Sequence, residues 1–384
     1  MARVCRDSGF EAIERTDCAD IETVLQSSRL KLIVTDLQMP DCDGIELMRL
    51  LAGVRTDVPV AIFSGFDPRA PNTAEAFGRS IGLQIVETLQ KPLSVAALKR
   101  LFRGAGDQVV LAPEEELQRA IRNHEVRLHF QPKVSFRAED FGRVVGFEGL
   151  ARWHHPVQGV ISPDRFIPLA ESSGLIGELT DDLIQYGLEQ VAEWQRNGET
   201  WSLAINISPH ILEDRGLADR IAQLAARAGV EPSRITLEIT ESGAMADPTR
   251  TMEILTRLRL KGFKLSIDDF GTGFSSLVQL YNLPFSELKI DKSFVMDIDD
   301  REEAQVIVRT LIDLAHNLSL QACAEGVETM AEWSQLLDYG CDRIQGYFAG
   351  RPMPAEDIPA WAEEWETRSK SITDMDRQRA AADG

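Results

Sequence analysis

Short apolar runs alternate with longer amphipathic stretches along most of the chain. Between Phe10 and Arg103 the runs FEAIE, LKLIVTDL, PVAIFSG and QIVETLQKP each fit a buried strand. Strands that alternate with helical segments favour a parallel sheet covered by helices, so residues 1–103 are predicted to form an α/β domain. A glycine-rich segment at 104–107 and Pro113 then interrupt the pattern, which indicates a linker over residues 104–113.

The remainder of the chain repeats this alternation on a larger scale. An amphipathic helix is predicted at Glu114–Asn123, and eight apolar runs follow at about 126–134, 144–150, 202–208, 235–241, 264–269, 287–292, 319–325 and 343–348. Eight strands with interleaved helices over roughly 240 residues match a (β/α)8 TIM-like barrel, predicted here at 114–365. The short gap between the first two runs predicts a hairpin with one antiparallel strand. Residues 366–384 are polar and charged and are predicted to be a loose tail.

Composition and charge restrict the partners that this chain can bind. The formal net charge is -20, nearly all of it after residue 103. An acidic surface repels a polyanion, so binding of a nucleic-acid polymer is not expected. The five cysteines lack a C-x-x-C spacing, which argues against a zinc site and fits a reducing cytoplasm. No signal peptide and no apolar run of about 18 residues are present, so we expect no membrane span.

Polar residues gather at the ends of the predicted barrel strands, where the active site of such a barrel lies. They comprise carboxylates with one lysine and two amides, namely Glu148, Asn206, Glu238, Glu241, Asp268, Asp269, Lys289, Glu325, Glu328 and Gln345. Any one of them fits a solvated strand end. Repulsion among so many carboxylates nevertheless requires a cation, and ligands that are all oxygen select Mg²⁺ or Mn²⁺ over zinc or copper.

The adjacent pair Asp268 and Asp269 is the most informative of these strand ends. Successive strand residues point to opposite faces, so two neighbouring aspartates can both reach a cleft only where the strand gives way to a loop. The glycine-rich segment 271–273 follows directly. The six histidines are scattered and no Ser-His-Asp order or nucleophile elbow is present, so acyl-transfer chemistry is unsupported.

Taken in order, the motifs of residues 114–365 strongly resemble the EAL family of cyclic di-GMP phosphodiesterases. The matching segments are FQPKV at 130–134, EGLARW at 148–153, NIS at 206–208, LEITES at 237–242, IDDFGTGFSSL at 267–277, LKID at 288–291, AEGVE at 324–328 and QGYFAGRPMP at 345–354. Gly149 departs from the alanine that is usual in the family, but Glu148 and Arg152 beside it are kept. The resemblance implies metal-dependent hydrolysis of one phosphodiester of cyclic di-GMP, giving linear pGpG.

The resemblance also implies roles for individual residues. A two-metal site with Mg²⁺ or Mn²⁺ would use Glu148, Asn206, Glu238 and Asp268 for the first ion, and Asp268 with Asp269 for the second. Two such ions can activate water and stabilise both oxygens of an in-line displacement at phosphorus.

Further roles carried over from the family concern the water, the substrate and the protein surface. Lys289 would orient the attacking water or neutralise developing phosphate charge. Glu325 resembles the family's general base or water-holding residue, and Gln345 would support that water. Arg152 and Gln131 would contact the substrate. Glu241 resembles the residue that anchors the glycine-rich loop, while Glu328 matches the pattern without an assigned role. The family often forms dimers through the face that carries this loop, so a homodimer is a hypothesis for this chain.

Two alternative functions remain open at this stage. One is a non-catalytic cyclic di-GMP receptor, which would be expected to lack metal ligands or the base, whereas this chain lacks neither. The other, independent of the resemblance, is a metal-dependent barrel lyase or enolising enzyme with Lys289 as its base. Lys289 has no second candidate base across the barrel, and Asn206 suits water and phosphate ligation better.

Residues 1–103 resemble a response-regulator receiver domain, an incomplete one of the flavodoxin-like type. The matching segments DLQMP with Asp43-Gly44, Ser64-Gly65 and Lys91-Pro92 would make Asp36 the phospho-acceptor, Ser64 the switch hydroxyl and Lys91 the phosphoryl contact. The family's first strand and acidic pair are missing, and residues 9–13 fit the second strand. The missing strand is central in such a sheet, so we favour a packing or association role over phosphorylation by a histidine kinase.

Overall fold

The chain forms two compact units, Met1–Val110 and Leu111–Gly384, in a computed structural model. In the second unit the structure describes residues 114–245, 247–271, 277–296, 298–299 and 301–382. In the first unit it describes residues 4–5, 11–13, 15, 24–25, 30–37, 43–54, 58–64, 74–75, 77–78, 81–83, 85–91, 98 and 101. Each unit has hydrophobic clusters of its own.

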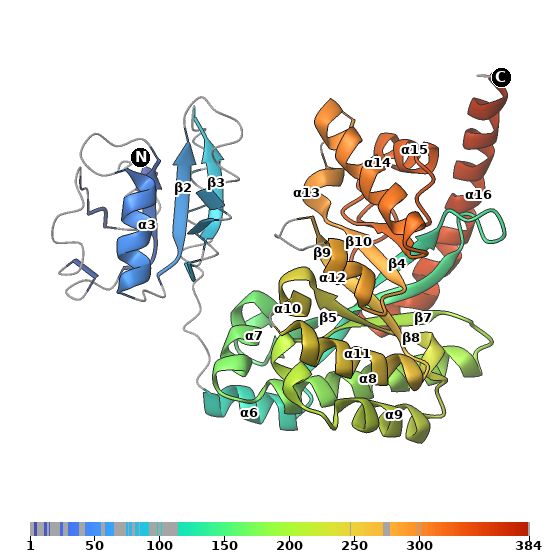
Figure 1. The fold of residues 1–384 in the computed structure, drawn as a ribbon, viewed down its shortest axis with the longest axis horizontal. Helices are drawn as coiled ribbons and strands as arrows, with labels where there is room; N and C mark the ends of the chain where they lie inside the picture. Colours follow the sequence, from blue (N-terminus) through green and yellow to red (C-terminus); the bar gives the residue numbers. More distant parts are fainter. Residues whose placement is uncertain are drawn as a thin grey trace. The chain divides into compact units, whose positions relative to one another are not determined.

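The second unit is a closed barrel of eight strands (Figure 1). The strands are β4 (Val126–Ser135), β5 (Val144–His155), β7 (Ser202–Asn206), β8 (Ile235–Thr240), β9 (Lys264–Phe270), β10 (Glu287–Ile290), β11 (Gln321–Ala324) and β12 (Arg343–Gln345). Strand β4 closes the barrel because it pairs with both β12 and β5, antiparallel in each case, while the other barrel pairs are parallel. The predicted barrel and its antiparallel hairpin are therefore confirmed. A short strand β6 (Gly159–Ile161) pairs antiparallel with the end of β5 and was not apparent from the pattern.

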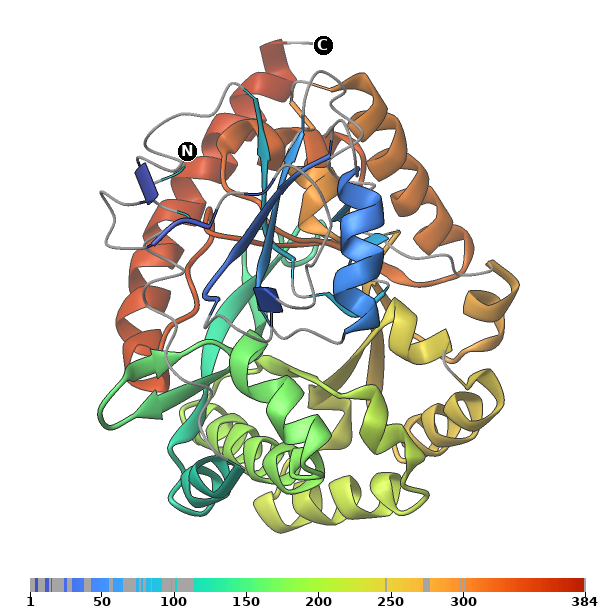
Figure 2. The same ribbon diagram turned by 90° about the vertical axis from the view of Figure 1, so that its left-hand side faces the viewer.

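Helices lie on the outside of these strands (Figures 1 and 2). They are α6 (Glu114–Arg122), α7 (Pro163–Ser172), α8 (Ile176–Arg196), η1 (Pro209–Glu213), α9 (Leu217–Ala228), η2 (Pro232–Arg234), α10 (Glu241–Met245), α11 (Pro248–Leu260), α12 (Leu277–Asn282), α13 (Lys292–Val295), α14 (Glu302–Asn317), α15 (Met330–Asp338), η3 (Ala355–Asp357) and α16 (Ile358–Ala382). The starts of α11 and α15 follow local rules. Helix α11 is capped by Asp247, whose side chain accepts a hydrogen bond from the Arg250 N–H, and Pro248 is its first residue. Helix α15 begins with a capping box formed by Thr329 and Glu332.

Alternation along the strands separates an apolar outer face from a polar interior. On β5, Phe147 and Trp153 are buried in the hydrophobic core, and Phe147 packs edge-on against Trp201 with 5.3 Å between ring centroids. Glu148 lies between them in sequence and therefore points to the opposite, inner face. The interior of this barrel consequently holds the polar side chains that make up the site.

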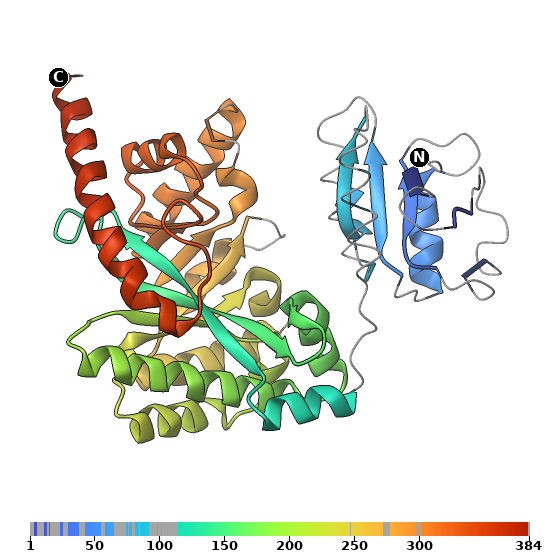
Figure 3. The same cartoon turned by 180° about the vertical axis from the view of Figure 1, so that it is seen from behind.

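Helix α16 corrects the prediction of a loose tail at 366–384, and the predicted boundary at 365 falls within this helix. Helix α16 runs along the outside of the barrel unit, coloured red in Figure 3. Trp361 and Trp365 stack with 6.0 Å between ring centroids, and Trp365 donates from Nε1 to the Gly142 carbonyl at 3.0 Å. Ile372, two turns beyond Trp365, is also buried. The sparse apolar residues thus share one face, because their spacing matches the helical repeat.

The first unit contains a three-stranded parallel sheet in the order β1 (Ile33–Asp36), β2 (Val60–Ser64) and β3 (Ile85–Gln90). Alternate residues of β2 enter two clusters. Ile62 packs in the cluster that includes helix α3 (Gly44–Gly53), whereas Phe63 packs with Leu98 and Leu101. Both faces of the sheet are therefore covered, as the predicted α/β receiver-like fold requires.

The strand predicted at residues 9–13 is not formed at 11–13, which have no regular secondary structure. Ile13 is 46% exposed. Among the described residues, no segment pairs with the free edge of β1. A strand is stable only when its backbone groups find partners, so an apolar pattern alone does not suffice here.

No helix within the described part of the chain combines the length and the apolarity needed to cross a bilayer.

Replacing Trp365 with alanine tests whether α16 belongs to the barrel core. Loss of a buried tryptophan and of its hydrogen bond should cost about 3–5 kcal/mol of unfolding free energy. The thermal midpoint of the barrel, measured by calorimetry, should fall by several degrees. Thr367→Ala, on the exposed face of the same helix, should leave it nearly unchanged. Equal effects of the two substitutions would show that α16 does not stabilise the barrel.

Candidate functional site

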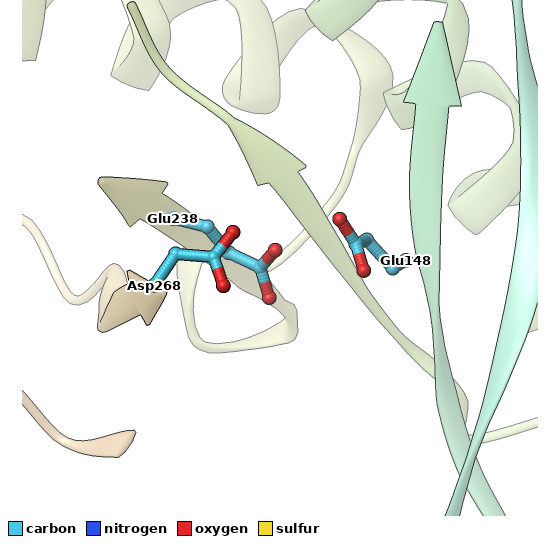
Figure 4. A group of neighbouring side chains, drawn as sticks. All are labelled: Glu148, Glu238 and Asp268. Carbon is cyan, nitrogen blue, oxygen red and sulfur yellow. The ribbon is translucent and has the colours of Figure 1, made fainter. Parts of the chain in front are cut away.

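The site lies inside the barrel at the carboxyl ends of its parallel strands. Glu148, Glu238 and Asp268 come from β5, β8 and β9, and all three are at least nine-tenths buried. Figure 4 shows their carboxylates reaching toward one another from separate strands. One oxygen of each lies within 4.8 Å of the others. The barrel therefore brings together three acidic residues that are far apart in sequence.

A β-bulge explains how both members of the Asp268–Asp269 pair reach the site. Leu288 and Ile290 of β10 pair with Ile267 and Phe270 of β9, so β9 has one residue more than its partner. Asp269 takes a left-handed conformation at φ 54°, which is uncommon for a residue other than glycine. Its N–H donates to Asp268 Oδ1 at 3.0 Å. The sequence predicted a change from strand to loop at Asp268 and Asp269, and the structure has a β-bulge there, within the last residues of β9.

Lys289 occupies the centre of this acidic cluster. Its Nζ lies 2.6 Å from Glu325 Oε1, 2.8 Å from Glu238 Oε2, 3.0 Å from Asp268 Oδ1 and 3.4 Å from Glu148 Oε2. The side chain is 1% exposed. Burial acts to lower the pKa of Lys289, but the four carboxylates raise it well above its ordinary value. Lys289 is therefore a fixed positive charge and not a proton acceptor at neutral pH, which disfavours the alternative that uses it as a base.

Two glutamines and an asparagine orient Glu148. Asn206 Nδ2 donates to Glu148 Oε1 at 2.6 Å, and Gln345 Nε2 donates to Glu148 Oε2 at 2.6 Å and to Gln131 Oε1 at 3.0 Å. The Gln131 amide donates to the Gly350 carbonyl. Gln131 is buried and supports Gln345, and its contact with the substrate stays a prediction. The buried Oε1 of Gln345 has no hydrogen-bond partner among the described residues and can accept one from a water.

The crowding of carboxylates changes the pKa of several members of the cluster. Burial raises the pKa of Glu325 to about 8, with Lys289 opposing the shift and Asp268 and Glu148 adding to it. Burial and the neighbouring Asp268 raise the pKa of Asp269 to about 6. Burial likewise raises the pKa of Glu238. A single lysine therefore does not fully balance the acidic residues that surround it.

The donor set fits two divalent cations that share a ligand. Glu148, Glu238 and Asp268 form one group, and Asp268, Asp269 and Glu325 form a second, each with one oxygen per residue within 4.8 Å of the others. All these donors are carboxylate oxygens, which Mg²⁺ and Mn²⁺ prefer. Asn206 adjoins the first group through Glu148 and offers an amide oxygen. The structure thus groups the predicted ligands around Asp268 and adds Glu325 to the second group.

Glu241 and Glu328 lie at the edge of the site in different environments. Glu241 is buried at the first residue of α10, and its Oε2 accepts the Gly271 N–H at 2.9 Å. This contact holds the start of the glycine-rich loop, whose residues 272–276 lie outside the described chain. Glu328 is exposed, and its N–H donates to the capping residue Glu332. Its position suggests a local structural role.

Arg152 lies four residues beyond Glu148 on β5 and therefore on the same face of the strand. Its side chain is partly buried and donates from NH1 to the Ala151 carbonyl at 2.8 Å. This position, further toward the open end of the barrel than the carboxylates, leaves further guanidinium donors available to an anionic group.

A second layer of buried charge beneath the site was not identified from the sequence. Lys133 Nζ bridges Glu238 Oε1 at 2.6 Å and Glu287 Oε1 at 3.1 Å. Glu287 Oε1 also accepts from the Ser266 hydroxyl, and its Oε2 pairs with Arg343 at 2.8 Å. Burial acts to raise the pKa of Glu287, but Lys133 and Arg343 lower it to about 2. Each residue of this layer lies two positions along its strand from a residue of the site: Lys133 from Gln131, Glu287 from Lys289, Ser266 from Asp268 and Arg343 from Gln345. Side chains two apart on a strand share a face, so this periodicity could have identified them.

In the first unit, Asp36 and Lys91 are brought together as the receiver resemblance implies. Asp36 ends β1 and Lys91 follows β3, and their side chains form an ion pair. The backbone of Ser64 ends β2, and the placement of its side chain lies outside the described features. The three positions therefore lie at carboxyl ends of parallel strands, the edge where such sheets bind ligands.

Comparison with known proteins shows which family contains this site. The EAL domain family matches residues 114–352, and the response regulator receiver domain matches residues 1–103. The chain belongs to the EAL domain family. It is 31% identical to the cyclic di-GMP phosphodiesterase RocR of Pseudomonas aeruginosa over 355 residues, which cover 90% of each protein.

Some relatives align with a shorter part of this chain than RocR does. The bifunctional diguanylate cyclase/cyclic di-GMP phosphodiesterase MucR of Pseudomonas aeruginosa is 40% identical over 246 residues, which cover 64% of this chain and 36% of that protein. A solved structure of the PaMucR phosphodiesterase with c-di-GMP aligns at a TM-score of 0.60 and 40% identity, covering 64% of this chain and 98% of that one. The chain thus spans about a third of MucR.

The raised pKa of Glu325 predicts how the stability of the metal-free protein depends on pH. A carboxyl group whose pKa is about 4.3 when unfolded and about 8 when folded stabilises the folded state fully below the lower value. This contribution is lost as the pH rises toward 8, and a tenfold change in proton affinity corresponds to about 1.4 kcal/mol. Thermal midpoints in chelator should therefore fall between pH 5 and 8.

The substitution Glu325→Gln should flatten this fall, because a glutamine does not ionise. Glu364→Gln, on the exposed part of α16, serves as the matched control and should keep the wild-type profile. A Glu325→Gln profile as steep as that of the wild type would contradict the assignment.

Proposed function

We propose that the chain hydrolyses cyclic di-GMP to linear pGpG with two divalent cations, Mg²⁺ or Mn²⁺. The observation that carries this proposal is that two clusters of three acidic residues lie at the open end of an EAL barrel and have Asp268 in common. Similarity to the phosphodiesterase RocR over 90% of each protein supports the same activity. Similarity to a structure that contains c-di-GMP supports the choice of substrate.

The cations would be held by Glu148, Glu238 and Asp268 on one side and by Asp268, Asp269 and Glu325 on the other, with Asn206 assisting the first ion. When bound, such a pair supplies Lewis-acid polarisation of the phosphodiester and lowers the pKa of the attacking water. It would also supply the positive charge that the excess of buried carboxylates requires.

Residues of the chain itself would position the water and the phosphate. Gln345 offers its unpaired Oε1 as an acceptor for a water proton, and Gln131 fixes the orientation of that amide. Lys289 is held within reach of both carboxylate groups, so its charge would offset the negative charge that develops during attack at phosphorus. Glu325 borders the same space and would orient the attacking water. Arg152 would hold a non-bridging phosphate oxygen at the open end.

The finer aspects of the proposal concern the assembly and its control. We place the protein in the cytoplasm, consistent with the free thiols of the described cysteines Cys323 and Cys341.

A homodimer through the face of the glycine-rich loop is supported by Tyr281 and Met296, which are exposed at 74% and 57%. The receiver-like unit would act by packing or association, with a histidine kinase partner as the less favoured alternative.

A hydrolysis assay with purified cyclic di-GMP tests the proposed activity. The full chain with Mg²⁺ or Mn²⁺ should convert micromolar substrate to pGpG, because every ligand and positioning residue is present. Glu148→Gln should lower kcat by at least about 100-fold, since it weakens the first cation site. The exposed Glu364→Gln should have no effect.

The same assay separates the enzyme from its alternative. Absence of turnover by the wild type would contradict the proposal. If cyclic di-GMP then still binds, measured by calorimetry, the chain is a receptor and not an enzyme.

A further inference from the structure

A second polar pocket lies at the opposite end of the barrel from the catalytic cluster. Its volume is about 390 Å³, and its lining includes four cationic residues, a serine and one carboxylate, namely Arg143, Arg234, Lys264, Arg343, Ser202 and Asp140. Lys264, Ser202 and Arg343 are the first residues of β9, β7 and β12, and Arg234 directly precedes β8. The catalytic residues stand at the other ends of the same strands, so the two sites are separate.

The periodicity of the strands explains why these side chains meet. Lys264 lies four positions before Asp268 on β9, and Ser202 lies four positions before Asn206 on β7, while Arg234 ends the turn η2 directly before β8. Residues four apart on a strand point to the same face and are separated by about 13 Å. The pocket is therefore the lowest layer of the same polar barrel interior whose uppermost layer holds the acidic residues.

The cations in this pocket are incompletely neutralised. Arg343 pairs with Glu287 at 2.8 Å, but Glu287 also pairs with Lys133, so one carboxylate serves two cations. The buried Nε of Arg343 has no hydrogen-bond partner among the described residues. The Lys264 ammonium makes no ion pair or hydrogen bond within the described chain, and the carboxylate of Asp140 already accepts the Ser135 hydroxyl. Positive charge therefore remains available to a ligand.

The electrostatics of Lys264 are consistent with a missing anion. Burial lowers the pKa of Lys264, and the positive charges of Arg343 and Arg259 add to this effect, with Glu287 opposing it. Like-charged groups held together in a protein whose net charge is -20 are an unusual arrangement, because acidic residues are abundant elsewhere on the chain. An anion in the pocket would relieve this repulsion.

We propose that this pocket binds a phosphate group, either inorganic phosphate or the phosphate of a small nucleotide. Guanidinium groups suit the planar, two-point recognition of phosphate oxygens, and the ammonium adds a compact charge. The volume lies near the lower end of the range for small-molecule sites, so it can hold phosphate with a small attached group. The proposal does not depend on the activity proposed for the opposite end of the barrel.

Calorimetric titration of the metal-free full chain tests this proposal directly. Inorganic phosphate and GMP are titrated separately at a fixed ionic strength, with sodium chloride as the reference salt. Binding of one or both above the chloride reference is the expected result, and the stronger ligand identifies the source of the phosphate group. Lys264→Gln should weaken that binding by at least about tenfold, because it removes the unpaired ammonium.

Further variants make the outcome specific to the pocket. Arg234→Gln should weaken binding in the same direction, Lys264→Arg should retain it, and the exposed Arg196→Gln outside the pocket should match the wild type. Thermal midpoints show whether each variant is folded. Absence of binding by the wild type, or equal affinity in the wild type and in both folded glutamine variants, would overturn the proposal.

Discussion

The packing of negative charge inside the barrel is the constraint on which the rest of this structure depends. Ordinary barrels of this type are filled by bulky apolar side chains, whereas this interior contains carboxylates at several levels. Buried charges are costly unless they are paired and hydrogen-bonded. Lys289 and Lys133 meet this requirement in part, since each one contacts two or more carboxylates. The remaining charge explains why the open end is suited to divalent cations.

The layers of the barrel interior form a continuous electrostatic network. Lys289 and Lys133 contact opposite oxygens of Glu238, and Lys133 continues to Glu287 and from there to Arg343. Charge changes from acidic at the carboxyl ends of the strands to basic at their amino ends. The same scaffold therefore presents an acidic cluster suited to cations at one end and a basic pocket suited to anions at the other.

Much of this arrangement could be predicted from the sequence. The apolar runs located all eight barrel strands, because a buried strand needs an almost continuous apolar outer face. The strand ends located the acidic residues, because parallel strands place their carboxyl ends at one edge. The conformation of Asp269 could not be predicted, since a bulge depends on the register between β9 and β10. Lys133 and Glu287 were missed because each is a single charged residue within an apolar run, and its buried partner is known only from the structure.

Two predictions failed for reasons of tertiary context. The polar composition of the predicted tail at 366–384 concealed a helix that continues to Ala382, because the buried Trp365 and Ile372 on one face suffice to attach it. Residues 11–13 showed the opposite error, since an apolar pattern did not produce a strand where no partner strand is described. Local pattern predicts which segments can form an element, whereas pairing and packing determine whether they do.

The most direct test of the charge-balance account is the number and position of cations in the barrel. Anomalous diffraction from crystals grown with Mn²⁺ should locate two ions per chain, with Asp268 as the ligand common to both. The first ion should contact Glu148 and Glu238, and the second Asp269 or Glu325. A barrel that binds no Mn²⁺ at these carboxylates, with Lys289 alone balancing their charge, would contradict the account.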